Sequence, residues 1–181
     1  MMMRICALLM TVFLLLTATA WSQSGKGHAP VPEARAQSII TVKIDGLVCS
    51  GPLGSGVFSV QAWSFGAVNS GTSSTGGGGG AGKATVSDLN VQKKFDECSP
   101  KLFEGVLTGR HFRSLILTQQ DKEDAVTTVT LKDVLISSYQ LAGSEHHPEP
   151  AETLSFDFRE VCVRTQNATE FCYDIAAQKP L

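Results

Sequence analysis

Residues 63–89 read WSFGAVNSGTSSTGGGGGAGKATVSDL, and the chain continues with NVQKKFDE (90–97) and CSPKLFEGVLTGRH (98–111). This stretch combines an aromatic strand end, a long glycine loop, a second strand and one short helix. The loop has too few apolar residues to pack a core of its own. It is therefore either a disordered linker or an arm that becomes ordered against another surface, and the choice between the two decides the function.

The first twenty residues have the three-part layout of a secretory signal peptide. Arg4 supplies a positive charge, residues 5–16 are an apolar run, and the small residues 18–20 suit a cleavage site near Ala20. The run is shorter than the roughly 20 residues that a membrane-spanning helix needs. An N-terminal membrane anchor is the alternative, but we expect cleavage and no membrane association of the mature chain.

Composition then bounds the remainder of the chain. Residues 21–37 mix Gly, Pro, Ala and single charges without apolar periodicity, so we expect a flexible leader there. About 160 residues follow the signal peptide, which is enough for one domain with a full core, here 38–178. The formal net charge of the chain is -2, and its charges are dispersed. Without a basic stripe, nucleic acid is not an expected partner.

Runs of β-branched and aromatic residues broken by turn residues dominate the chain beyond residue 38. They predict seven strands, at 38–44, 57–65, 83–91, 111–119, 125–138, 153–164 and 169–176. Many short strands and one helix predict a mainly β fold, a two-sheet antiparallel β-barrel with one short flanking α-helix. An open antiparallel sheet with the helix on one face is the alternative.

One helix is expected after residue 98. Ser99 can cap it, Pro100 suits its first position, and Gly109 suits a left-handed exit. Its apolar residues fall on a single stripe, which we expect to pack on the barrel: Leu102, Phe103, Val106 and Leu107.

The last two predicted strands pair in one register if the chain folds about Asn167. Cys162 then faces Cys172, and one side of the pair is wholly apolar: Val161, Val163, Phe171 and Tyr173. The same register opposes Glu160 to Asp174, a mild repulsion, so we expect a bulge at that pair.

Four of the five cysteines remain after removal of the signal peptide, an even number in an exported chain. Directly opposite residues of an antiparallel pair lie at a separation that a disulfide can bridge, which predicts the bond Cys162–Cys172. Cys49 and Cys98 then pair by elimination. Zinc is the competing use of these thiols, but no C-x-x-C or H-x-x-x-H spacing occurs, so we expect no metal site.

The chain contains no catalytic pattern that its residues support. Residues 77–83 match G-x-x-x-x-G-K, but Ala84 stands where a phosphate loop needs a magnesium-binding hydroxyl, so we expect no nucleotide and no other cofactor. No G-x-S-x-G elbow occurs, and the histidines lie in the expected leader, at a strand start and in a predicted turn. We expect no catalytic residues and no enzyme activity. Asn167 begins a glycosylation sequon at a predicted hairpin tip.

Four segments together resemble a known family: residues 63–89 as quoted above, SPKLFEGVLTGRH (99–111), LKDVLISSYQLAGS (131–144) and ETLSFDF (152–158). They resemble the haemolysin-coregulated proteins, Hcp, the tube subunits of type VI secretion systems, over residues 39–176. The resemblance implies a two-sheet barrel with a flanking helix. It also implies hexameric rings that stack into a hollow tube, whose lumen can hold small effector proteins.

The resemblance also assigns a role to the glycine loop. In the family, the loop between the second and third strands projects from the barrel and contacts neighbouring subunits, and the matching loop here is 66–85. Glycines permit close backbone approach, and a partner surface can offset the ordering entropy. A loop without contacts is the alternative. The implied subunit-interface residues are Asn69, Gly71, Gly76, Gly77, Gly78, Gly79, Gly80, Gly82 and Lys83.

The chain departs from the family in two respects. Hcp subunits are normally made without a signal peptide, and four cysteines, taken as disulfide-bonded, suit an oxidising compartment. We therefore expect a periplasmic or secreted structural protein that forms homo-oligomeric rings or tubes. The alternative is an exported monomeric β-barrel binding module that has lost tube assembly, and a measurement of oligomeric state separates the two.

Overall fold

The computed structural model describes residues 38–71, 82–121, 123 and 125–181. The expected signal peptide and leader, and the glycines 76–80, lie outside these residues. The described part contains one helix, α1 (Ser99–Thr108), and these strands: β1 (Ile39–Ile44), β2 (Ser50–Gly51), β3 (Gly54–Ser55), β4 (Val57–Ser59), β5 (Ala62–Ser64), β6 (Ala67–Asn69), β7 (Ala84–Val86), β8 (Leu89–Lys94), β9 (His111–Gln120), β10 (Val126–Ser144), β11 (His147–Thr165), β12 (Phe171–Asp174) and β13 (Lys179–Pro180).

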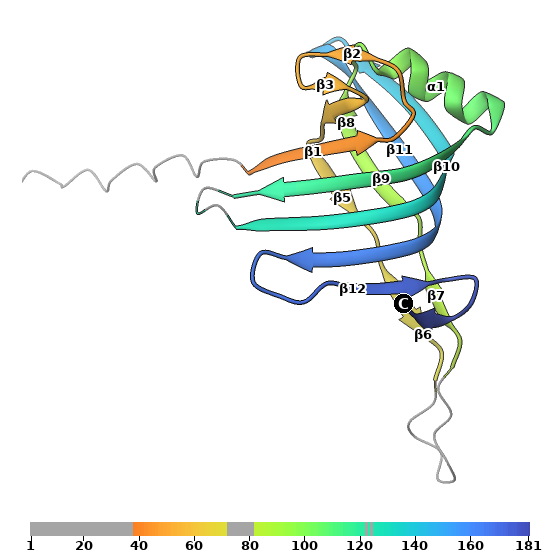
Figure 1. Ribbon diagram of the computed structural model, residues 1–181. Coiled ribbons are helices and arrows are strands. Elements are labelled where there is room, and N and C mark those ends of the chain that lie inside the picture. The colour runs from red at the N-terminus through yellow and green to blue at the C-terminus, as the bar shows by residue number, and fades with distance from the viewer. Residues whose placement is uncertain (1–37, 72–81, 122, 124) are drawn as a thin grey trace, which may run out of the picture. The chain divides into compact units, whose positions relative to one another are not determined.

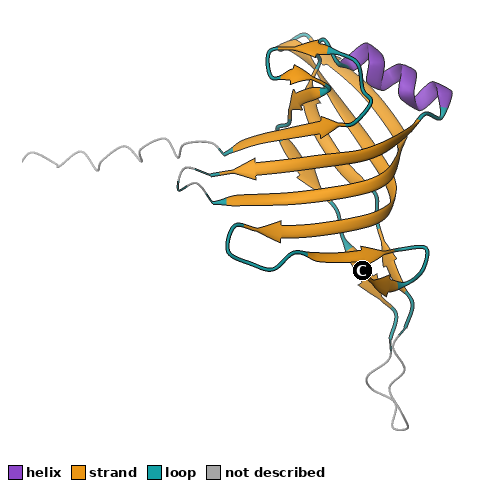
Figure 2. Cartoon of the chain, viewed as in Figure 1, coloured by secondary structure: helices purple, strands orange, loops and turns teal. Residues whose placement is uncertain are grey.

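One strongly curved antiparallel sheet forms the body of the domain (Figures 1 and 2). β11 is its central strand: one edge pairs with β10, and the other pairs first with β8 and then with β12. From β10 the sheet continues through β9 and β1 to β4. The expected class, mainly β with one short helix, is confirmed.

The consecutive strands β4 and β5 connect two distant edges of this sheet. β4 pairs with β1, whereas β5 pairs with β8. Between them, Val60 donates its N–H to Ile40 O at 2.9 Å, and Gln61 donates its N–H to Gln92 O at 2.8 Å. The chain thus passes from the β1 edge to the β8 edge within two residues, which encloses the core between the two walls of the curved sheet.

Strand alternation fills that core. In β8 every second side chain is buried, beginning with Leu89 and Val91, while the residues between them are exposed. β11 contributes Leu154 and Phe156 in the same way, both fully buried. Further buried residues come from the opposite wall: Val42, Ile44, Leu115, Leu117, Val129 and Leu131. The period of two therefore places one face of each strand inside.

The helix packs on β10 through only part of the expected stripe, since Val106 as well as Leu102 packs against the core. Leu102 and Gly105 are buried, whereas Phe103 is 47 % exposed and Leu107 69 % exposed. A Cβ at Gly105 would lie 3.0 Å from the Ile136 side chain, so the missing side chain lets the helix approach the sheet closely. The expectation that Phe103 and Leu107 pack inward is wrong. The helix lies closest to β10 at Gly105, and this orientation leaves both side chains exposed to solvent.

The helix ends are close to those expected. Cys98, not Ser99, is the N-cap residue, and Ser99 is the first helical residue. Gly109 adopts φ 61°, the left-handed exit, and its N–H donates to Val106 O at 3.4 Å.

Replacing Leu102 by Ala is expected to lower the free energy of unfolding by about 2–5 kcal/mol, because it leaves a cavity beneath the helix. Phe103→Ala is the matched control, and its cost is expected to stay below about 1.5 kcal/mol, since its main contact is the tilted pair with the Tyr139 ring at 5.1 Å. Urea unfolding measures both. Equal losses for the two variants would contradict the docked face described above.

Strands β11 and β12 pair in the expected register, with Cys162 opposite Cys172 and Val161 opposite Tyr173. The bulge expected at Glu160 and Asp174 is wrong, since these residues form a regular pair of the ladder. Each carboxylate has its own cation: Lys132 Nζ lies 2.8 Å from Glu160 and Arg159 3.4 Å from Asp174. These contacts offset the repulsion. The register shifts occur instead where β10 pairs with β11, between 136 and 138 and between 142 and 144.

Candidate functional site

A two-stranded ribbon, β6 and β7, continues the β5–β8 pair beyond the body of the sheet. Its register is Ala67↔Val86, Val68↔Thr85 and Asn69↔Ala84. Figure 1 shows the ribbon projecting at the end of the domain far from α1. The expected strand 83–91 is therefore divided into β7, in the ribbon, and β8, in the body.

The base of the ribbon is fixed by a reciprocal pair of hydrogen bonds. Ser87 donates its N–H to Gly66 O at 2.8 Å, and Gly66 donates its N–H to Ser87 Oγ at 2.8 Å. One step into the barrel, Trp63 Nε1 donates to Gln119 Oε1 at 2.8 Å, and its ring stacks on Phe65 at 6.1 Å. These contacts tie the ribbon to the body and set its direction.

The ribbon itself offers surface to another molecule. Within the described residues, β6 and β7 pair only with each other, so their outer edges present unpaired backbone N–H and C=O groups. All of β6 is exposed, and Val68 is 71 % exposed. An isolated two-stranded hairpin is only marginally stable in water. The arrangement is therefore suited to backbone and apolar contacts with a neighbouring surface.

The residues assigned to the subunit interface divide into two groups. Asn69, Gly71, Gly82 and Lys83 lie where the ribbon meets the glycine segment; Asn69 Oδ1 accepts the Gly71 N–H at 2.9 Å, and Lys83 is exposed. The remaining five, Gly76, Gly77, Gly78, Gly79 and Gly80, lie outside the described residues.

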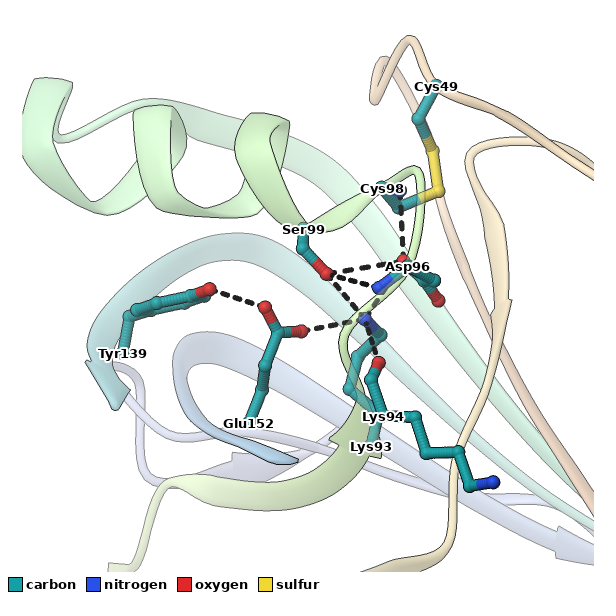
Figure 3. Close-up of polar contacts among 8 residues, drawn as sticks. All are labelled: Cys49, Lys93, Lys94, Asp96, Cys98, Ser99, Tyr139 and Glu152. Atoms are coloured by element: carbon teal, nitrogen blue, oxygen red, sulfur yellow. Dashed lines mark hydrogen bonds and ion pairs between the residues drawn. A yellow bond between two sulfur atoms is a disulfide. The ribbon is translucent and has the colours of Figure 1, made fainter. Parts of the chain in front are cut away.

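The four cysteines lie in two pairs at disulfide distance. The sulfur atoms of Cys49 and Cys98 are 1.98 Å apart, and those of Cys162 and Cys172 are 2.06 Å apart. Cys98 directly precedes α1, and Cys49 precedes the β2–β3 hairpin, so the first bond holds this hairpin at the start of the helix (Figure 3). Glu170 lies near the second pair, but both sulfurs there are already bonded to each other.

A buried polar cluster beside this disulfide was missed by the sequence analysis. Lys93 of β8 and Glu152 of β11 are 0 % and 1 % exposed, and Lys93 Nζ lies 2.7 Å from Glu152 Oε2. Lys93 also contacts Asp96 and Ser99 at the start of α1 (Figure 3). The cluster therefore joins two strands and the helix N-terminus.

Tyr139 of β10 completes the cluster by donating its hydroxyl proton to Glu152 Oε1. Burial, and then the hydrogen bond to the Glu152 carboxylate, raise the pKa of Tyr139 well above its usual value, so the phenol stays protonated at neutral pH. Both partners of the ion pair are buried. Their contacts tie β8, β10 and β11 to the start of α1.

The comparisons with known proteins identify the family. Residues 52–164 match the family model for the type VI secretion system effector Hcp. The chain belongs to this family. Protein hcp1 of Pseudomonas aeruginosa is 36 % identical to this Hcp protein over 88 residues, which are 46 % of the chain and 54 % of the relative. The Hcp chain thus spans about half the length of the curated relative that it matches.

Solved structures share the fold of this Hcp protein. A type six secretion system protein is 24 % identical, with a TM-score of 0.69, covering 80 % of this chain and 100 % of its own. Hcp1 from Salmonella typhimurium is 23 % identical, with a TM-score of 0.65, covering 80 % and 99 %. An effector of the type VI system from Yersinia pestis is 24 % identical, with a TM-score of 0.61, covering 75 % and 98 %. At these identities the likeness establishes the fold alone.

No helix among the described residues of the Hcp chain is both long enough and apolar enough to cross a membrane.

Proposed function

We propose that this Hcp protein is a non-enzymatic structural subunit that assembles into hexameric rings, which stack into tubes. Residues 66–85 make the contact with a neighbouring subunit. The observation that carries the proposal is the exposed β6–β7 ribbon, whose outer edges are unpaired within the described residues. Membership of the Hcp family supports the same conclusion.

The ribbon supplies what a closed ring requires. A head-to-tail interface needs two different complementary patches on each subunit, and a projecting arm provides one of them. Contact with a partner would pair the backbone groups of β6 or β7 and cover Val68, which is 71 % exposed in the single chain. In a tube built this way, small effector proteins would occupy the lumen.

The compartment follows from the N-terminal segment and the cysteines. A signal peptide over 1–20 sends the chain through general export, and disulfides at Cys49–Cys98 and Cys162–Cys172 form and persist in oxidising compartments. We therefore propose that the mature protein lies in the periplasm or the medium, with residues 21–37 as a leader that precedes the domain 38–178.

The test is to express the full chain in a bacterium, recover it from periplasm and medium, and measure its N-terminus and particle mass. We expect an N-terminus just after Ala20, a mass six times that of the cleaved chain by mass photometry, and six-fold rings by electron microscopy. A strict monomer at high micromolar concentration would refute ring assembly. An intact N-terminus in the cytoplasm would refute export while leaving assembly standing.

An exported binding module is the second candidate function. A shallow hollow of about 400 Å³ beside α1 is lined by Phe95, Ser99, Pro100, Phe103, Tyr139 and Leu141. Phe103 is 47 % exposed and Leu141 52 % exposed, so the hollow offers apolar area to a ligand. A monomeric protein whose Phe103→Ala variant loses affinity for an apolar dye would favour this candidate over the ring.

A further inference from the structure

The amino group of Lys93 is surrounded by more acceptors than it has protons. Its Nζ lies 2.7 Å from Glu152 Oε2, 2.8 Å from Lys94 O, 2.9 Å from Asp96 Oδ1 and 3.0 Å from Ser99 Oγ. An ammonium group donates three hydrogen bonds, so one of these four contacts is not a donated bond. The shortest of the four is the contact with Glu152 Oε2, which Figure 3 draws.

Lys93 and Glu152 are shielded from water. Both side chains are fully buried, and the Phe58 ring lies 5.3 Å from Lys93 Nζ. Removing two charges from water is costly, and a neutral product of the same two groups avoids that cost. The contact distance of 2.7 Å between Nζ and Oε2 also places the nitrogen beside the carboxyl group whose Cδ it would attack.

We propose that Lys93 and Glu152 condense into an intramolecular isopeptide bond. The Nζ lone pair attacks Glu152 Cδ, a C–N bond forms, and the bond from Cδ to Oε2 breaks. Of the three ammonium protons, two leave with Oε2 as water and one stays on the amide nitrogen. The positive and the negative charge disappear together, and nothing is oxidised or reduced.

Two neighbours are placed to assist this condensation. Asp96 Oδ1, 2.9 Å from Nζ, can take a proton from the ammonium group and free its lone pair for attack. Tyr139 donates its hydroxyl proton to Glu152 Oε1, the oxygen that carries negative charge in the tetrahedral intermediate and becomes the amide carbonyl. The raised pKa of Tyr139 keeps that proton in place.

The product leaves every polar partner satisfied. The amide N–H can donate to Lys94 O, and the new carbonyl keeps the Tyr139 hydroxyl. Ser99 Oγ keeps the Asp96 N–H at 2.8 Å, and Asp96 Oδ1 keeps the Cys98 N–H at 2.9 Å. No buried group would lose its only partner. The bond would join β8 covalently to β11.

The decisive experiment is a mass measurement on the wild-type protein with all cysteines reduced and alkylated. We expect an intact mass lower by one water. Trypsin does not cut after an acylated lysine, so we also expect peptide 84–94 linked through Lys93 to peptide 133–159. An intact mass equal to that of the uncondensed chain, with a free peptide 84–93, would overturn the proposal.

The exposed pair Lys132 and Glu160 is an internal control, because its Nζ–Oε2 distance is 2.8 Å but its side chains are 54 % and 22 % exposed. We expect no cross-link there, and equal cross-linking of both pairs would point to sample handling and overturn the argument from burial.

Asp96→Asn keeps the acceptor for the Cys98 N–H but cannot take the proton from Lys93. Its cross-linked fraction in freshly purified protein is expected to fall at least about tenfold; an unchanged fraction would remove Asp96 from the mechanism.

Discussion

Replacing Val68 by Asp is expected to convert assembled rings into monomers without lowering the melting temperature of the domain. Val68 is 71 % exposed on the ribbon, so a charge there has little effect on the single chain, where surface substitutions usually change stability by less than about 0.5 kcal/mol. In an interface the same charge would be desolvated without a partner. We expect the concentration needed for ring formation to rise at least about tenfold, a loss of about 1.4 kcal/mol per contact.

Val48 provides the matched control, since it is the same residue type, is 70 % exposed and lies outside the ribbon. Val48→Asp should leave ring formation unchanged in mass photometry. Shortening the glycine segment 76–80 should reproduce the Val68 phenotype, again with a nearly unchanged melting temperature. Equal loss of rings in Val48→Asp, or a large fall in the melting temperature of the shortened chain, would contradict an interface role for residues 66–85.

Lys93→Met is expected to be among the most destabilising single substitutions in the domain, at about 3–5 kcal/mol. Lys93 is fully buried, and its removal leaves the Glu152 carboxylate buried without a cation. The substitution lowers the free energy of unfolding whether the wild-type residues form an ion pair or an amide, because the variant has a buried, unpaired carboxylate in either case. Urea unfolding of the oxidised protein measures the loss.

Two further variants separate charge burial from a general loss of packing. Replacing the three strand residues of the cluster, with Lys93→Met, Glu152→Leu and Tyr139→Phe together, should recover most of the stability, because Glu152 no longer leaves a fully buried carboxylate without a cation. Lys132→Met breaks an exposed pair of similar length and should cost far less than Lys93→Met. A combined variant no more stable than Lys93→Met alone would mean that shape, rather than charge, determines the effect.

The local pattern of the sequence predicted most elements of the fold. Alternation and turn residues located the strands of the body, and Pro100 and Gly109 located the helix to within a residue or two. The register of β11 and β12 followed from matching apolar and cysteine faces. These features depend on residues close in sequence, so a local reading captures them.

The face on which the helix docks could be predicted only in part from its apolar stripe, because Leu102 and Val106 pack against the core but the other two residues do not. Four apolar residues indicated one side, but the missing side chain of Gly105 allows a closer approach to Ile136 on β10. Phe103 and Leu107 are left partly or largely exposed as a result. The docked face depends on the shape of the partner strand, which the helix sequence does not contain.

The Lys93–Glu152 pair was missed because the two predicted strands that should contain it were a few residues too short. The strand predicted at 83–91 stops before Lys93, and the strand predicted at 153–164 begins after Glu152. Extending the alternation Leu89, Val91 by one step places Lys93 inside, and extending Leu154, Phe156 backward does the same for Glu152. A charged residue at each position concealed the pattern.

The sequence by itself determined the β class, the single helix, the pairing of the cysteines along β11 and β12, and the family resemblance. Each of these depends on short-range periodicity or on a local motif. Only the tertiary structure decided how the strands on either side of the glycine loop are placed. β6 and β7 pair with each other and project as a ribbon that is fixed at Gly66 and Ser87. The tertiary structure alone also brought Lys93 to Glu152, 59 residues apart. Such contacts depend on how strands that are distant in sequence pair in the sheet, and local propensity does not encode that pairing.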